Sequence, residues 1–85
     1  MEIIYLPQAD EDLVFWIKTG NKVILKKIAQ LTEAILKNPT KGIGKPEALK
    51  YNLAGKWSRR ITDEHRFIYQ IEDDLIKVYS LKGHY

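Results

Sequence analysis

The hydrophobic positions of residues 1–20 first follow the pattern of a strand and then that of a helix. The segment EIIYL, residues 2–6, is short and rich in β-branched side chains, which favours a strand. Pro7 suits the first turn of a helix, the acidic residues 10–12 suit its positive N-terminal end, and Gly20 suits its end. The apolar face of this helix is predicted to contain Leu13, Trp16 and Ile17.

A second helix is predicted after Asn21, whose side chain suits an N-cap. Its apolar positions recur at steps of four, three and four, and they form one buried stripe of Ile24, Ile28, Leu31 and Ile35. The stretch NPTKGIGKP, residues 38–46, has the glycines and prolines of a loop. This loop separates the two halves of the chain.

The second half of the chain changes to a period of two. WSRRI, HRFIYQI and LIKVYSL, residues 57–61, 65–71 and 75–81, are separated by the short breaks TDE and EDD. This spacing predicts three strands joined by tight hairpins in an antiparallel meander. Before them, KPEALKYNL is expected to hold one turn of helix beginning at Pro46. In the middle strand one face is predicted to carry Phe67, Tyr69 and Ile71, and the other Arg66, Ile68 and Gln70.

The order of elements predicts an α+β fold, βααβββ, with two N-terminal helices on one face of an antiparallel sheet and the other face open to a ligand. A chain of 85 residues has length for a single domain, 1–85. It contains no cysteine, which excludes disulfides and thiolate metal sites. The longest apolar run, LVFWI at residues 13–17, falls far short of the ~20 residues of a membrane span, and no signal-peptide pattern opens the chain. We therefore expect a soluble cytoplasmic protein that does not contact membranes.

The net charge of +3 comes from the second half of the chain. Residues 41–85 carry nine lysines and arginines against six acidic residues, whereas residues 1–40 carry five of each. The second half also holds the three arginines Arg59, Arg60 and Arg66, whose planar guanidinium groups match phosphate oxygens. This distribution favours a polyanionic partner, nucleic acid first, over the alternative of a plain solvated surface.

Few residues have the chemistry of a catalytic site. Metal binding is poorly supported, EDD is better explained as a hairpin turn, and GIG at residues 42–44 lacks the surroundings of a phosphate loop. Each remaining candidate also has an ordinary structural explanation; for example, Arg59 and Arg60 are neighbours in a strand, so at most one can face a given site. These candidates are Glu47, Lys50, Arg59, Arg60, His65, Arg66, His84 and Tyr85.

Taken together, these side chains fit the cleavage of RNA without a metal ion or other cofactor. The 2′-hydroxyl of RNA can attack the adjacent phosphate if a base removes its proton, cations stabilise the charge on the phosphate, and an acid protonates the leaving oxygen. Glu47 is a candidate base, Arg66 with Lys50 or Arg60 would supply the cations, and His84 is a candidate acid because the ordinary pKa of histidine, ~6.5, is close to neutral.

The last two residues, His84 and Tyr85, are expected to reach the active cleft at the end of the final strand. Tyr85 would stack on a base or hold the nucleotide through its hydroxyl and terminal carboxylate. We therefore expect that a variant lacking both residues loses activity without much loss of fold.

The stretch GKPEALKYNLAGKWSRRITDEHRFIYQI, together with the terminal HY, closely resembles the YoeB-type toxins of the RelE superfamily. The resemblance implies a compact fold like that of the small microbial ribonucleases. It also implies a metal-independent endoribonuclease that cuts mRNA in the A site of a translating ribosome and so inhibits translation. The implied partners are mRNA, the ribosome and a YefM/Phd-like antitoxin whose C-terminal segment folds onto the toxin; a homodimer is a further expectation.

The resemblance also implies a role for each matched residue. Glu47 of KPE matches the general base, Arg66 of EHR the group that stabilises the transition state, and the terminal His84 the general acid. Lys50 and Arg60 match phosphate-binding positions, Glu64 an acidic position near the site, and Tyr85 the terminal tyrosine. The chain departs from its relatives at Tyr51, where they can carry histidine, and at Gly83, where a tyrosine can precede the terminal histidine.

Two other kinds of function stay open at this point. The same scaffold could serve as a non-catalytic module that binds RNA or a protein, or as a relative that poisons DNA gyrase. The joint presence of Glu47, Arg66 and His84 favours the nuclease, since a binding protein has no chemical need to combine them.

Overall fold

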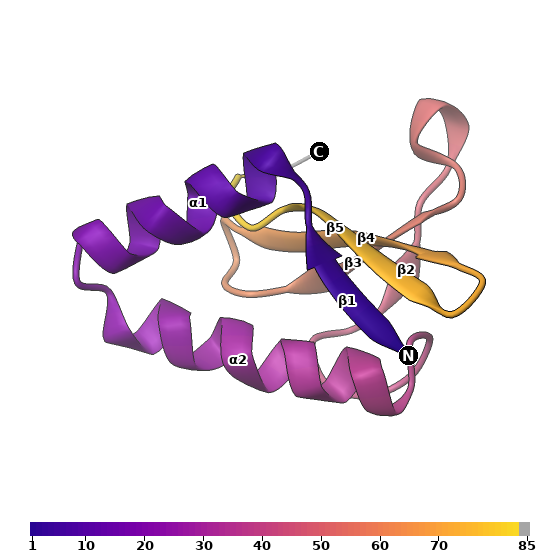
Figure 1. The fold of residues 1–85 in the computed structure, drawn as a ribbon, viewed down its shortest axis with the longest axis horizontal. Coiled ribbons are helices and arrows are strands. Elements are labelled where there is room, and N and C mark those ends of the chain that lie inside the picture. The colour runs from indigo at the N-terminus through magenta and orange to yellow at the C-terminus, as the bar shows by residue number, and fades with distance from the viewer. Residues whose placement is uncertain (84–85) are drawn as a thin grey trace.

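The fold combines two helices with a five-stranded sheet, and the computed structural model describes residues 1–83 (Figure 1). The elements in chain order are β1 (Glu2–Tyr5), α1 (Pro7–Lys18), α2 (Lys22–Lys37), β2 (Glu47–Ala48), a 3-10 helix (Tyr51–Leu53), β3 (Lys56–Arg60), β4 (Arg66–Glu72) and β5 (Leu75–Ser80). The sheet has the strand order β1-β5-β4-β3-β2. In the described residues, no helix has both the length and the apolar character needed to cross a membrane.

The sheet contains the predicted meander and two additions to it. Strands β3, β4 and β5 are antiparallel neighbours, as expected. The first strand, β1, pairs with β5 in parallel, with Glu2 opposite Leu75 and Tyr5 opposite Val78, so the sheet is mixed. A fifth, two-residue strand, β2, pairs with the free edge of β3. The α+β class with both helices on one side of the sheet is confirmed (Figure 1).

The two helices begin and end where their sequence signals predict. Gly20 has a φ of 68°, the left-handed conformation that ends a helix and that glycine adopts at little cost. The side-chain oxygen of Asn21 accepts a hydrogen bond of 3.1 Å from the backbone N–H of Ile24, which makes it the N-cap of α2. The predicted stripe of α2 is buried throughout: Ile24, Ile28, Leu31 and Ile35.

Helix α1 is turned slightly away from its predicted orientation. Its buried positions are Ala9, Asp12 and Trp16, whereas Ile17 is 58% exposed, so the prediction that Ile17 faces the core was wrong. Because each residue advances ~100° around a helix, a helix that buries Trp16 turns Ile17 away from the core. Asp12 was assigned to the positive helix end, but its carboxylate is buried and accepts the backbone N–H of Leu81 at 2.9 Å.

The inner face of the sheet packs on the helices and contains one charged side chain. Phe67 and Tyr69 share this face, as predicted, and both are fully buried. Arg59 is also fully buried. Its guanidinium donates to the hydroxyl of Tyr69 and to three backbone carbonyl oxygens of the loop at residues 38–43. This arginine therefore fixes the long loop to the sheet, and the other face of β3 is left to Arg60.

The prediction of a helical turn beginning at Pro46 was wrong. Glu47 and Ala48 instead form β2, because they pair with Ser58 and Trp57 at the open edge of β3. Only the short 3-10 helix follows, and the chain around it extends away from the sheet at the upper right of Figure 1. Glu47 consequently lies in a strand and does not stabilise the positive end of a helix.

Candidate active site

Three of the predicted site residues lie together on the outer face of the sheet. Glu47 in β2 is directly opposite Ser58 in β3, and Arg60 follows two residues later on the same face of β3. Arg60 is in turn directly opposite Arg66, the first residue of β4. Such diagonal neighbours lie ~7–8 Å apart, within reach of long side chains. Local strand pairing thus brings one carboxylate and two guanidinium groups into one small area.

The two arginines form an electrostatically unfavourable pair. Like charges directly opposite each other in a sheet are destabilising, and Arg60 is exposed while Arg66 is half-buried. The orientation of Arg66 is fixed, because its Nη1 donates to the carbonyl oxygens of Thr62 at 2.7 Å, Asp63 at 2.9 Å and His65 at 3.2 Å. An anion between the two guanidinium groups would relieve their repulsion, so this position favours a phosphate.

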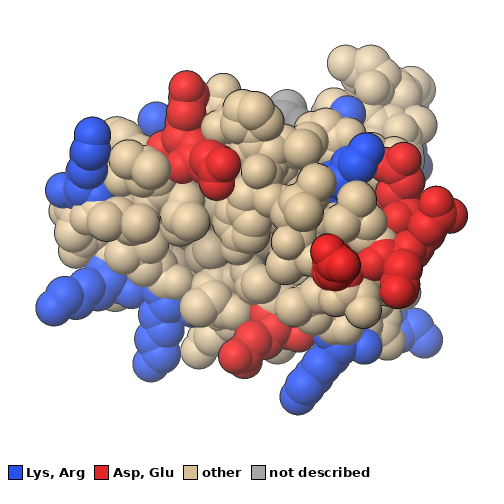
Figure 2. Space-filling view, in the orientation of Figure 1, with Lys and Arg blue, Asp and Glu red and all other residues tan. Residues whose placement is uncertain are grey.

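The ends of the sheet differ in charge. Strand β4 begins at Arg66 and ends at Glu72, and seven residues of strand extend over ~20 Å. At the far end, Glu72 and the turn residues Asp73 and Asp74 lie with Glu2 around a shared hollow. Figure 2 shows these acidic side chains gathered at the right, over the end of the β4–β5 hairpin. This acidic end does not favour a polyanion, whereas the opposite end holds Arg60 and Arg66 together with the acidic loop residues Asp63 and Glu64.

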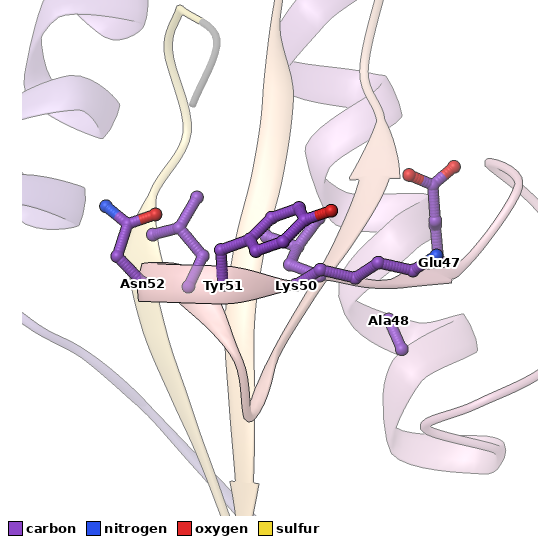
Figure 3. Close-up of a pocket in the computed structure, with 7 residues that line it drawn as sticks. Glu47, Ala48, Lys50, Tyr51 and Asn52 are labelled. Carbon is purple, nitrogen blue, oxygen red and sulfur yellow. The ribbon is translucent and has the colours of Figure 1, made fainter.

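The segment after Glu47 forms a pocket of about 580 Å³ lined by residues 47–53. Figure 3 shows the side chain of Lys50 extending towards the part of the segment that holds Glu47, with the Tyr51 ring beside it. Tyr51 is 91% exposed and has a φ of 58°, which is uncommon for a residue with a large side chain. A cation, Lys50, and an exposed aromatic ring, Tyr51, thus follow the candidate base Glu47 within four residues of the sequence.

The end of β5 is attached to helix α1. The backbone N–H of Leu81 donates to the buried carboxylate of Asp12 at 2.9 Å, and the carbonyl oxygen of Leu81 accepts from the indole N–H of Trp16 at 3.0 Å. Both side chains come from the buried face of α1. They fix the backbone at the start of the final segment.

The next residues are attached to the start of β4. The carbonyl oxygen of Gly83 accepts from the backbone N–H of Arg66 at 3.1 Å, and the N–H of Gly83 donates to the Nδ1 atom of His65 at 2.8 Å. His84 and Tyr85, the predicted acid and nucleotide-binding residue, lie outside the described residues. The backbone that leads to them is therefore bound directly beside Arg66.

The structure thus brings together Glu47, Arg60 and Arg66, with Lys50 in the segment next to Glu47. Glu64 is exposed in the β3–β4 loop, where its backbone N–H donates to the hydroxyl of Thr62. In the part of the chain that the structure describes, no three His, Asp or Glu side chains are grouped as metal ligands.

Sequence reasoning missed the structural use of two residues near this site. His65 was one of several single candidates, and Asp12 was explained by the helix dipole. The signal for Asp12 was present: it lies four residues before Trp16, so the two share a helical face that is otherwise apolar. The contact of His65 with Gly83 joins residues 18 positions apart, and no local pattern reveals it.

Comparisons with known proteins agree with one another. The sequence matches the family of the YoeB-like toxins of bacterial type II toxin–antitoxin systems over residues 5–85. It is 42% identical to Toxin YoeB of Escherichia coli K12 over 85 residues, the full length of both chains. The structure superimposes on the YoeB/ParE toxin from Agrobacterium tumefaciens with a TM-score of 0.94 and 37% identity over both whole chains.

Two further matches are to solved structures from Staphylococcus aureus. One is a YoeB–YefM complex, with a TM-score of 0.87 and 48% identity over 98% of this chain and 95% of that one. The other is a YoeB dimer, with a TM-score of 0.89 and 45% identity over 100% of this chain and 98% of that one.

Proposed function

The chain belongs to the family of YoeB-like toxins of bacterial type II toxin–antitoxin systems, and on this premise we propose that it is a metal-independent endoribonuclease that cuts mRNA in the A site of a translating ribosome. The observation that supports this most is the grouping of Glu47, Arg60 and Arg66 on the outer face of the sheet. The attachment of Gly83 to the backbone of Arg66 adds to it, since His84 follows Gly83 in the chain.

The proposed reaction is an attack of the RNA on its own backbone. The carboxylate of Glu47 removes the proton of the 2′-hydroxyl, and the resulting oxygen forms a bond to the adjacent phosphorus. The bond from phosphorus to the 5′ oxygen breaks, and that oxygen takes a proton from His84. The products are a 2′,3′-cyclic phosphate and a free 5′-hydroxyl. Arg66, with Arg60, stabilises the negative charge that builds on the phosphate oxygens.

The other predicted residues bind the substrate in this proposal. Lys50 contacts a neighbouring phosphate, and Tyr85 stacks on a base or holds the nucleotide. Glu64, at the rim in the β3–β4 loop, would set the position of the strand by repelling its phosphates.

The ribosome has a physical role in this scheme. A carboxylate is a weak base for a hydroxyl, so the reacting atoms must be held in the productive geometry before the proton moves. We expect the free protein to degrade naked RNA slowly and to cut mRNA quickly when the ribosome holds it. Rapid cleavage of purified RNA at nanomolar protein would contradict ribosome dependence.

The regulatory partner proposed for this chain is a YefM/Phd-like antitoxin. A YoeB protein of Staphylococcus aureus has been solved with YefM and also as a dimer, which supports an antitoxin complex and a homodimer here. A surface that attracts RNA phosphates would also accept an acidic or amphipathic antitoxin segment. In this proposal the protein acts on ribosomes in the cytoplasm.

Induced expression in a bacterial host tests the proposal. The wild-type chain should arrest growth, and Glu47→Gln, Arg66→Ala and His84→Gln should each relieve the arrest at equal protein level. Glu11→Gln is the matched control, because Glu11 is an exposed glutamate of α1 away from the outer face of the sheet. Thermal melting of each variant separates loss of activity from loss of fold.

The pattern of results separates the three kinds of function. Cleavage of mRNA in purified translating ribosomes, lost in the three variants, is the expected result. Growth arrest that persists in all three variants would instead indicate a stoichiometric binder. Arrest with DNA damage and intact mRNA would indicate a gyrase poison.

A further inference from the structure

The imidazole of His65 holds the backbone of the residue that precedes His84. The N–H of Gly83 donates to the Nδ1 atom of His65 at 2.8 Å. A backbone N–H can only donate, so Nδ1 must carry a lone pair and the proton of the neutral ring must be on Nε2. The contact therefore fits only the tautomer of His65 that carries its proton on Nε2.

His65 is held in place at its ring and at its main chain. The rings of Trp16 and His65 pack edge to face, with centroids 4.8 Å apart and planes at 76°. The backbone N–H of His65 donates to the hydroxyl of Thr62 at 3.1 Å, which fixes the position of its main chain. Trp16 also binds the carbonyl oxygen of Leu81, so one indole supports both the histidine and the segment that the histidine binds.

We propose that His65 is a positioning residue for catalysis: its unprotonated Nδ1 fixes the backbone of Gly83, the residue from which the chain continues to the proposed acid, His84. This inference rests on the function proposed above. It assigns to His65 a role that is separate from binding RNA, since its Nδ1 is occupied by the protein's own backbone.

The reason for expecting a large effect lies in the backbone of the last segment. Gly83 has a φ of 78°, and a Cβ at this position would meet no atom of the described residues within 4 Å, so packing against them does not restrain it. The described contacts that hold Gly83 are its N–H to His65 and its carbonyl oxygen to Arg66. Loss of one of them would let the segment move, and a misplacement of ~1 Å can lower a catalytic rate by roughly 10²-fold.

Two amide variants of similar size test the proposal. The side-chain oxygen of asparagine falls close to the place of Nδ1, whereas that of glutamine falls one bond further out. We expect His65→Asn to keep kcat within about threefold of wild type and His65→Gln to lower it by roughly 10- to 100-fold, as a misplaced reacting group would. KM should change little in both, because neither variant alters a group that binds RNA.

The measurement is single-turnover cleavage of mRNA on purified translating ribosomes. Lys82→Ala is the matched control, because Lys82 lies in the same segment as Gly83. The variant removes the contact of the Lys82 ammonium with the Phe15 ring, at 4.0 Å, and leaves the hydrogen bonds of Gly83 intact. It should cleave as wild type does. Equal rates for His65→Asn and His65→Gln, whether both high or both low, would overturn the proposal.

A second measurement does not depend on activity. The ¹⁵N spectrum of His65 should show a neutral ring protonated on Nε2, and the Gly83 amide should exchange faster in His65→Gln than in wild type. A ring protonated on Nδ1 would overturn the proposal even if the protein cleaves RNA. If the spectrum is as expected but the wild-type chain cleaves no mRNA, the proposed function is wrong, whereas the hydrogen bond between Gly83 and His65 is confirmed.

Discussion

The two faces of the sheet contain the same kind of charged side chain and use it in opposite ways. Arg59, on the inner face, is fully buried, and protein atoms accept the hydrogen bonds of its guanidinium. Arg60, the next residue, is exposed on the outer face and lies opposite Arg66. The alternation of a strand, which turns successive side chains to opposite faces, accounts for the difference.

This difference separates stability from the proposed chemistry. On the inner face the charge of Arg59 is tolerated because backbone carbonyl oxygens accept the hydrogen bonds of its guanidinium. These bonds also fix the loop at residues 38–43 to β3. On the outer face the pairing of two arginines lowers stability and attracts an anion. Substitution of the buried arginine on the inner face should therefore destabilise the protein, and substitution of the outer-face arginines should inactivate it while it stays folded.

The largest expected effect on stability comes from Arg59. Arg59→Leu would leave the carbonyl oxygens of Asn38, Lys41 and Ile43 without this donor and would release the loop. Buried groups that lose a charged partner are costly, so we expect the free energy of unfolding to fall by about 3–5 kcal/mol. Urea denaturation of the purified variant measures this.

Arg60→Leu is the matched control for Arg59→Leu. It removes the same guanidinium one residue later, from an exposed position, and we expect a change of at most about 0.5 kcal/mol. Similar losses of stability in the two variants would show that burial of the guanidinium of Arg59 does not stabilise the fold more than the exposed guanidinium of Arg60 does.

The next effect concerns activity on the outer face. Arg66→Ala removes a cation from the proposed reaction centre, and loss of one such group lowers kcat by about 10²–10³-fold. Arg66→Lys should recover only part of this rate, because an ammonium group cannot reproduce the planar fork that contacts the turn carbonyls and, in the proposed mechanism, a phosphate. Ribosomal cleavage assays measure both variants, and full activity of Arg66→Ala in folded protein would remove Arg66 from the mechanism.

A smaller effect is expected where the loop approaches the inner face. A Cβ on Gly44 would lie 2.7 Å from the Leu31 side chain and 3.2 Å from the Cβ of Arg59, and the φ of Gly44 is 83°. Leu31 is fully buried and has little room to move, so Gly44→Ala should lower stability by about 2–3 kcal/mol. Gly20→Ala is the control: its φ of 68° is similar, but its Cβ would meet no atom of residues 1–83 within 4 Å, so about 1 kcal/mol is expected. Equal losses in thermal or urea melts would show that close approach is unimportant at Gly44.

Local patterns predicted most of this architecture. The α2 stripe, the cap at Asn21, the end of α1 at Gly20 and the meander of β3, β4 and β5 all follow from periodicity and terminal signals within a few residues. The assignment of Arg59 and Arg60 to opposite faces followed from the same alternation.

Contacts between distant segments could not be predicted in this way. Glu47 was placed in a helical turn because Pro46 precedes it, but the unpaired edge of β3 is a stronger influence and draws the segment into β2. Likewise, Asp12 and His65 bind backbone groups 69 and 18 residues away. The grouping of Glu47 with Arg66 was expected from the family resemblance, and its geometry depends on this tertiary pairing.

The smallest predicted effect is a pH dependence on the inner face. Burial raises the pKa of the Tyr69 hydroxyl above its ordinary value of 10.0, and the neighbouring Arg59 only partly opposes this. The hydroxyl donates to the carbonyl oxygen of Pro39 at 2.6 Å and accepts from Arg59, so Tyr69→Phe should lower stability by about 1–2 kcal/mol at neutral pH.

The sign of the pH effect follows from the raised pKa of Tyr69. Below pH 10 both the folded and the unfolded chain keep this proton, so the stability difference between wild type and Tyr69→Phe should be constant. Above pH 10 the unfolded wild-type chain loses the proton first, and its advantage over Tyr69→Phe should shrink by up to about 1.4 kcal/mol per pH unit. Urea melts of both proteins between neutral pH and pH about 11 test this, since the lysines titrate in both and cancel. If the stability advantage of wild type over Tyr69→Phe instead grows above pH 10, Arg59 stabilises the Tyr69 phenolate by more than burial destabilises it.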